Sequence, residues 1–139
     1  MIKKDRRARS FVTIMIVIAV SAFLLRFAVD RLIQINMSQN ESNASANLKL
    51  ISAALENYAK DNHGIFPAEL ATLTKTSPRY IQKDYTQVPL KGYNFICSRL
   101  ESSGYSCSAA PVKCGLSGNV IHNVSTGGVL ISEECSKKE

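Results

Sequence analysis

The chain has 139 residues and a formal net charge of +6, from 17 Lys and Arg against 11 Asp and Glu. Residues 1–10 alone contain five basic side chains and one acidic side chain, so they carry +4 and the other residues only +2. A basic cluster directly before an apolar run orients a membrane segment, so this charge predicts topology, and no nucleic-acid partner is predicted. The length leaves room for one small soluble domain after the apolar run.

An apolar run without a charged residue occupies residues 11–25, with the sequence FVTIMIVIAVSAFLL. As a helix this run spans about 22 Å, which is short of the ~30 Å hydrocarbon core of a bilayer. Phe27, Ala28 and Val29 extend it beyond Arg26, whose side chain can reach toward the membrane surface. Residues 11–35 are therefore predicted to form a transmembrane or filament-core helix.

Two maturation schemes fit this N-terminus. In the first, a signal peptidase cuts after Ala22, because Val20, Ser21 and Ala22 supply small residues at the end of a short apolar stretch. In the second, the cut falls between Ser10 and Phe11 and leaves the apolar helix on the mature protein. The two schemes predict different mature proteins.

The second scheme rests on a resemblance. A short basic leader that ends in the small residue Ser10, followed by Phe11, Thr13 and an apolar helix, resembles the class III signal of type IV pilins and type II secretion pseudopilins. The resemblance implies cleavage by a prepilin peptidase after Ser10 and N-methylation of Phe11. The family usually has Gly before the cut and Glu as the fifth mature residue, whereas this chain has Ser10 and Met15. Without that carboxylate the subunit cannot neutralise a neighbour's N-terminal amine in the family's way, which favours a minor or special position in a filament.

Charged residues return at the end of the apolar segment. Arg26, Asp30 and Arg31 are predicted to need charged partners on neighbouring helices once the segment is buried. Asp30 and Arg31 are adjacent in sequence and cannot face one another well on one helix.

The helix is predicted to continue through residues 36–63. Residues 36–47 are rich in Asn and Ser, which compete with the helical backbone, so this is the weakest helical stretch. An apolar face then returns at helical spacing and predicts docking on a sheet. Its members are Leu48, Ile51, Leu55 and Tyr58. The residues expected on the water-facing side are Lys49, Ser52, Glu56, Asn57 and Lys60. Gly64 and Pro67 are predicted to end the helix.

Residues 55–73, LENYAKDNHGIFPAELATL, carry the more specific part of the resemblance. Their pattern of an Ala- and Tyr-containing helix end, a polar turn, an aromatic-Pro pair and a Leu-containing helical turn is similar to pseudopilin-like proteins, and a Tyr-hydrophobic pair follows. The residues that carry it are Tyr58, Asp61, Asn62, Gly64, Phe66, Pro67, Leu70, Leu73, Tyr80 and Ile81.

From Tyr93 onward the apolar period becomes two. Residues 93–97 and 105–109 alternate on either side of a polar connection at residues 101–104, which predicts a hairpin. Residues 119–124 and 129–132 flank the turn Ser-Thr-Gly-Gly and predict a second hairpin, which resembles the terminal hairpin of pilin-like heads. The predicted fold is α+β and pilin-like, with a long N-terminal helix packed on a four-stranded antiparallel sheet.

Four cysteines lie in the last third of the chain: Cys97, Cys107, Cys114 and Cys135. A small domain with a thin core is commonly stapled by disulfides in an oxidising compartment. Cys97 and Cys107 could face one another across the first hairpin and leave Cys114 to reach Cys135, but all three pairings stay open. The spacing contains no Cys-X-X-Cys, so no zinc site is predicted.

Three further residues have side chains that can take part in chemistry: His63, His122 and Asp84, the single acidic residue of the segment 80–91. No catalytic motif accompanies either histidine, so helix-end and strand-surface roles are predicted and no enzyme activity or cofactor is expected. One carboxylate does not make the calcium loop that some pseudopilins carry, and no metal site is predicted.

The sequence therefore predicts four parts: a basic cytoplasmic leader (1–10), a transmembrane or filament-core helix (11–35), a periplasmic half of the helix (36–63) and a disulfide-stapled head (64–139). The predicted protein is a structural subunit of a type IV pilus or type II secretion pseudopilus. It would cross the bacterial inner membrane once with its head in the periplasm, and its partners would be other pilin-like subunits and the prepilin peptidase. The alternative is a small secreted or anchored disulfide-bonded binding domain whose signal peptide is cut after Ala22. Pilus, secretion and competence systems are not distinguished.

Overall fold

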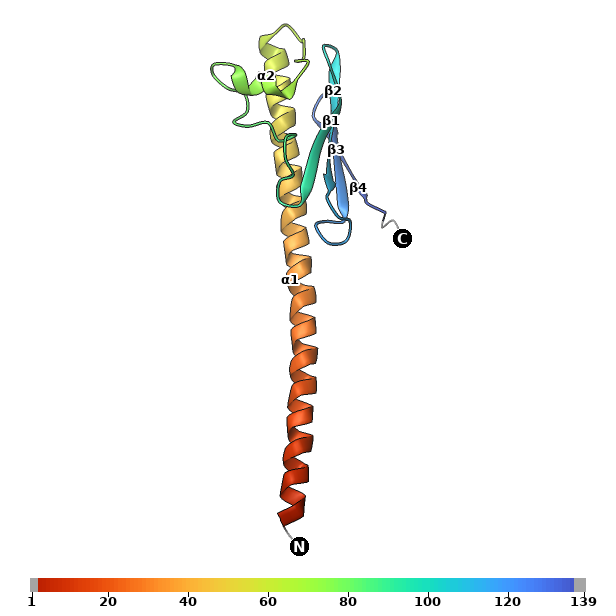
Figure 1. The fold of residues 1–139 in the computed structure, drawn as a ribbon. Coiled ribbons are helices and arrows are strands. Elements are labelled where there is room, and N and C mark those ends of the chain that lie inside the picture. Colours follow the sequence, from red (N-terminus) through yellow and green to blue (C-terminus); the bar gives the residue numbers. More distant parts are fainter. Residues whose placement is uncertain (1–2, 137–139) are drawn as a thin grey trace. The chain divides into compact units, whose positions relative to one another are not determined.

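The computed structural model describes the backbone of residues 3–136 and the side chains of residues 9–136. The chain forms two compact units, Met1–Ile35 and Asn36–Glu139. The described part of the first unit is helical, and the second combines the later part of the same helix with a sheet (Figure 1). The predicted fold class is confirmed: a long N-terminal helix packs on a four-stranded antiparallel sheet.

Helix α1 runs from Lys3 to Asp61. We expected it to begin at Phe11, but the leader is helical as well, because Lys, Arg and Ala favour helix and no Gly or Pro interrupts the run. The Asn- and Ser-rich residues 36–47 are also helical. There Asn40 and Glu41 contact backbone groups of the head, and such tertiary contacts offset a poor local propensity.

The end of α1 has the expected cap, with one shift of position. His63 and Gly64 both have left-handed backbone, with φ of 58° and 82°. The Gly64 N–H donates to the carbonyl of Ala59 at 2.7 Å, which is the closing bond of a Schellman motif. The first left-handed residue is therefore His63, and this gives that histidine the helix-end role predicted for it.

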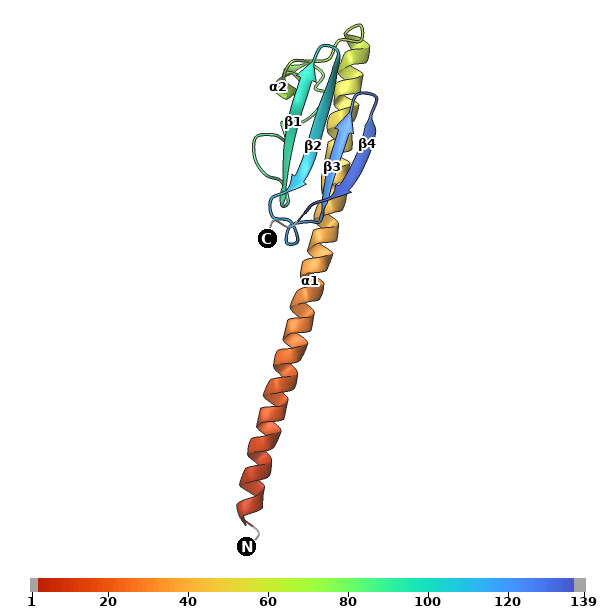
Figure 2. The same ribbon diagram turned by 90° about the vertical axis from the view of Figure 1, so that its right-hand side faces the viewer.

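The short helix α2 covers Leu70–Lys75, with Leu70 and Leu73 buried. Strands β1 (Tyr93–Glu101) and β2 (Gly104–Pro111) form the first hairpin, and β3 (Val120–Ser125) and β4 (Val129–Glu134) form the second. The order in the sheet is β1-β2-β3-β4, so each strand pairs with its neighbour in sequence (Figure 2). Both predicted hairpins are confirmed, although β1 continues four residues beyond its predicted end at Cys97 and the other strand ends move by at most two residues.

The core lies between α1 and one face of the sheet. The apolar helix face is confirmed at Leu48, Ile51 and Leu55, which are at most 1 % exposed. The sheet contributes Tyr93, Phe95, Tyr105, Cys107, Ala109 and Val124 to the same cluster. On the helix, however, Ser52 is buried and Glu56 half-buried, so their predicted water-facing position was wrong. Both are held by hydrogen bonds to the sheet side, which simple apolar periodicity does not register.

Candidate functional site

The apolar segment, residues 11–25, is not buried by the rest of the described chain. Within the described residues, one helix is long and apolar enough to cross a membrane, and none of its most apolar window is buried. Phe11, Ile18, Phe23 and Leu25 are 64 %, 59 %, 71 % and 68 % exposed. A continuous apolar surface of this kind requires lipid or other helices around it.

The predicted processing residues lie on this exposed helix. Ser10 and Phe11 are helical, exposed and followed one turn later by Met15, which is 54 % exposed. Met15 therefore adds to the apolar surface of the helix.

The hydroxyl groups within the segment are satisfied inside the helix. Thr13 Oγ1 donates to the carbonyl of Arg9 at 2.8 Å, and Ser21 Oγ donates to the carbonyl of Val17 at 2.6 Å. Such bonds to the preceding turn remove the cost of placing a hydroxyl in an apolar medium. Both residues are compatible with burial in lipid or between helices.

The charged residues of the segment differ in their surroundings. The Arg31 guanidinium carbon lies 5.3 Å from the centre of the Phe27 ring, which is a cation–π contact. Arg26 and Asp30 are exposed, and among the described side chains the one ion pair is Arg99–Glu101, at 3.5 Å in the head. The predicted helix site residues thus include one charge with a partner on its own helix and two without.

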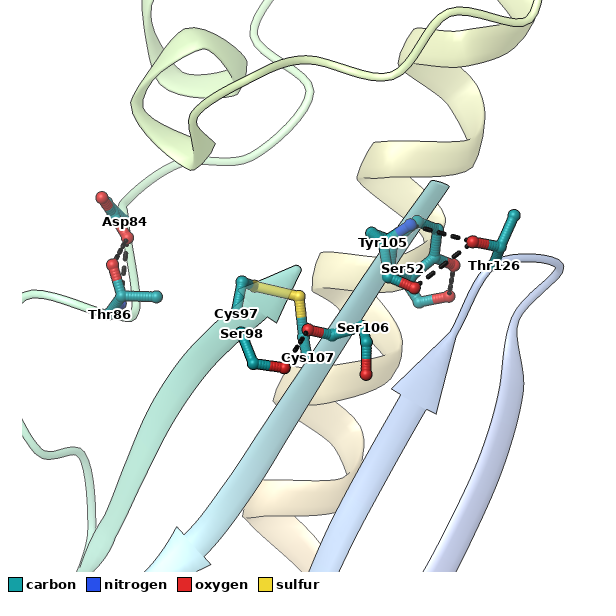
Figure 3. The surroundings of a disulfide bond; sticks show 9 residues. All are labelled: Ser52, Asp84, Thr86, Cys97, Ser98, Tyr105, Ser106, Cys107 and Thr126. Carbon is teal, nitrogen blue, oxygen red and sulfur yellow. Dashed lines mark hydrogen bonds between the residues drawn. A yellow bond between two sulfur atoms is a disulfide. The ribbon is translucent and has the colours of Figure 1, made fainter. Parts of the chain in front are cut away.

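A buried polar network ties α1 to the sheet (Figure 3). Ser52 Oγ lies 2.8 Å from the Tyr105 hydroxyl, which in turn donates to Glu56 Oε1 at 2.9 Å. Because the tyrosine proton is used in the bond to Glu56, Ser52 must be the donor to Tyr105. Burial raises the pKa of Tyr105 to about 12, so its hydroxyl stays protonated at neutral pH. Glu56 Oε1 also accepts from the Gly127 N–H at 2.7 Å and thereby holds the β3–β4 turn.

A second anchor lies earlier on α1. Glu41 Oε1 accepts from the Asn119 N–H at 2.7 Å, and Asn40 Nδ2 donates to the Ser117 carbonyl at 3.0 Å. Beside them Gly118 faces the Tyr93 ring so closely that any side chain at position 118 would collide with it. The loop before β3 is therefore fixed to the helix by polar contacts that the sequence did not reveal.

The four cysteines form the Cys97–Cys107 and Cys114–Cys135 disulfides. This is one of the three pairings that the sequence left open. The first bond joins directly opposite residues of β1 and β2, and the second ties the end of β4 to the loop before β3 (Figure 3 shows the first). Both disulfides join residues within the head.

A hollow of about 420 Å³ lies beside β1 in the head. It is lined by α2, by Asp84, Thr86 and Gln87 of the preceding loop, and by Phe95 to Cys97 of β1. Burial favours a higher pKa for Asp84, but its hydrogen bonds with Thr86 and Gln87 outweigh this and hold the pKa below its ordinary value. Within the described residues no group of three potential metal ligands occurs.

His122 lies in β3 and is only 8 % exposed, so the strand-surface role predicted for it was wrong. Its Nδ1 is 2.8 Å from Ser132 Oγ on the paired strand, and its Nε2 is buried without a hydrogen-bond partner. His122 and Ser132 are directly opposite in the β3–β4 register, so the contact is an ordinary cross-strand pair. With no third group to orient the imidazole through Nε2, the pair lacks the arrangement of a nucleophilic triad.

Comparison with known proteins gave no match: no protein-family model, no curated protein and no solved structure matches the chain.

Proposed function

We propose that this chain is a non-enzymatic structural subunit of a pilin-like filament, either a type IV pilus or a type II secretion pseudopilus. The observation that carries the proposal is the apolar segment, whose side chains are exposed on every side of the helix. The same helix continues into the core of a small head. A subunit of this build is inserted in the membrane before assembly and buries its apolar helix among other subunits afterwards.

The distribution of apolar residues around the helix separates the segment from an amphipathic surface helix. Phe11, Val12, Ile14, Met15 and Ile16 lie on different sides of the helix and are all more than half exposed. An amphipathic helix would place them on one stripe. The apolar side chains around the whole circumference support a segment that is surrounded by lipid and then by several neighbouring helices.

Two separate observations, one on the leader and one on the head, support the proposed topology. The basic residues before Phe11 favour an N-terminus in the cytoplasm. The two disulfides of the head favour an oxidising compartment, which in a bacterium is the periplasm. The proposed partners are the prepilin peptidase, which would cut after Ser10, and other pilin-like subunits.

The mature N-terminus tests this proposal. The full chain is produced in a bacterium with a prepilin peptidase and in a matched strain without it, and its intact mass is measured from the membrane fraction. We expect a chain that starts at Phe11, with or without one methyl group, and an uncut chain in the peptidase-free strain. A chain that starts at Phe23 in both strains contradicts the proposal and identifies a secreted disulfide-bonded domain.

A further inference from the structure

Two opposite charges without a partner lie at the end of the apolar segment. Arg26 and Asp30 are both exposed, and within the described part of the chain neither belongs to an ion pair. Arg31 differs from them because its guanidinium covers the Phe27 ring. Arg26 and Asp30 are thus one basic and one acidic group that a buried environment would leave uncompensated.

The two charges share one side of the helix. Four residues of helix turn through about 400°, so Arg26 and Asp30 point within about 40° of one another. An ion pair within one helix is weaker when the basic residue precedes the acidic one, and the described side chains do not form it. The geometry thus leaves each charge available to another helix.

The arrangement is self-complementary. If two parallel copies are offset along the helix axis by four residues, about 6 Å, Asp30 of one copy lies level with Arg26 of the other. The contact is heterologous, so it leaves an unused Arg26 on one copy and an unused Asp30 on the other. On the N-terminal side of the two charges, residues 11–25 contain no charged residue and are mostly apolar, and their burial makes the pairing necessary.

We propose that Asp30 of one copy pairs with Arg26 of a neighbouring copy when the apolar segments pack together. The inference rests on the proposed function and names its partner, a second copy of this chain. In a single copy in the membrane, both side chains can extend to the headgroups, so the charges are tolerated before assembly. Between packed helices that route is closed, and the pair from two copies replaces it.

Charge-reversal variants test the pairing. The Asp30→Arg variant makes both positions basic and the Arg26→Asp variant makes both acidic, so neither can pair with itself or within its own helix. Together they offer each other opposite charges. Full-length chains are given one of two different C-terminal tags, are co-expressed pairwise and extracted in mild detergent, and the amount of one tag recovered with the other is measured.

We expect wild type to be recovered with wild type, each reversal variant to be recovered with itself at a level reduced by about tenfold, and the two variants together to return to near the wild-type level. Equal recovery of all combinations overturns the pairing while self-assembly stands. Failure of wild type to be recovered with itself also overturns it, and the mature N-terminus at Phe11 or Phe23 then decides separately whether the filament proposal survives.

A pair of neutral variants controls for the possibility that the charge-reversal variants fail to insert in the membrane. Asp30→Asn and Arg26→Gln remove one charge each and make membrane insertion easier. Insertion is scored by recovery in the membrane fraction and by intact head disulfides. Each neutral variant should be recovered with itself less than wild type is, and undiminished recovery of both overturns the proposal.

Discussion

Residues 9–35 and residues 36–61 belong to the same helix, but their apolar side chains have different surroundings. In the later stretch, Leu48, Ile51 and Leu55 are buried by the chain's own sheet. In the earlier stretch, Phe11, Ile18 and Phe23 are more than half exposed, so no described residue of the chain buries them. The difference teaches that the head buries its own apolar helix face, whereas the apolar segment needs lipid or other helices around it.

The comparison predicts that a core substitution in the later stretch acts on the head. Leu55→Ala should lower the free energy of unfolding by about 2–5 kcal/mol, because it removes a fully buried side chain and leaves a cavity. The neighbouring Leu50 is 54 % exposed, and Leu50→Ala should stay within about 0.5 kcal/mol. Denaturant unfolding of the full chain in detergent, followed by near-UV circular dichroism, measures both. Equal effects would mean that the helix face has been assigned wrongly.

The disulfide between Cys114 and Cys135 should also act on the head alone. Replacing both residues by Ser releases a loop of 21 residues and should cost about 3 kcal/mol of unfolding free energy. Recovery in the membrane fraction should not change. A loss of membrane recovery at a temperature where the head remains folded would show that the two regions are not independent.

A charge in the earlier stretch should have the opposite signature. Ile18 is the middle residue of the apolar run, and Ile18→Arg should disfavour membrane insertion by about 2.5–3.5 kcal/mol. The unfolding free energy of the head should be unchanged, and Ile18→Leu is the matched control. Alkaline extraction of membranes measures insertion, and retention of Ile18→Arg equal to that of Ile18→Leu would count against a membrane-spanning segment.

The sequence predicted those features that depend on local periodicity. The helix face at Leu48, Ile51 and Leu55 and both hairpins follow from residues close together in the chain. The pairing of Ser52 and Glu56 with Tyr105 joins residues about fifty positions apart, and the pairing depends on how the helix is set on the sheet. No local pattern contains that information.

In the candidate site, too, the features set by local sequence were predicted and those set by contacts between distant residues were not. The uncharged apolar run and the charged residues that follow it can be read directly from the sequence. Neither depends on contacts between distant parts of the chain. The cross-strand contact of His122 with Ser132 required the register of β3 and β4, which hairpin prediction leaves undefined by a residue or two. The start of the helix at Lys3 was missed because the basic leader was treated as a separate part.

The polar contact between α1 and the sheet gives a smaller test of the head. Glu56→Gln keeps the acceptor oxygen but removes its charge, which weakens the bonds from the Tyr105 hydroxyl and the Gly127 N–H. The expected cost is about 1–2 kcal/mol of unfolding free energy. Glu69 is exposed and makes no side-chain cap bond to α2, so Glu69→Gln is the control and should be neutral. If Glu56→Gln lowers the unfolding free energy no more than Glu69→Gln does, Glu56 does not contribute to the stability of the head.

The smallest expected effect is on pH dependence. Burial lowers the pKa of His122, with Glu41 partly opposing this and Lys49 adding to it. The folded chain then binds this proton more weakly than the unfolded chain, so the contribution of His122 is fully present above the unfolded pKa of about 6.5 and is lost as the pH falls through the lower folded value.

His122→Gln should therefore flatten the decline of head stability below about pH 6.5. Unfolding free energies measured at a series of pH values test this. An unaltered slope in His122→Gln would assign the acid sensitivity to another group.

We propose that the apolar segment stays on the mature protein and is buried by assembly. The most direct measurement is mass spectrometry of sheared filaments, purified from a strain that expresses the chain with its prepilin peptidase. The account predicts that the chain is present in the filaments and begins at Phe11. Recovery of the chain only as a soluble protein that begins at Phe23 would contradict it.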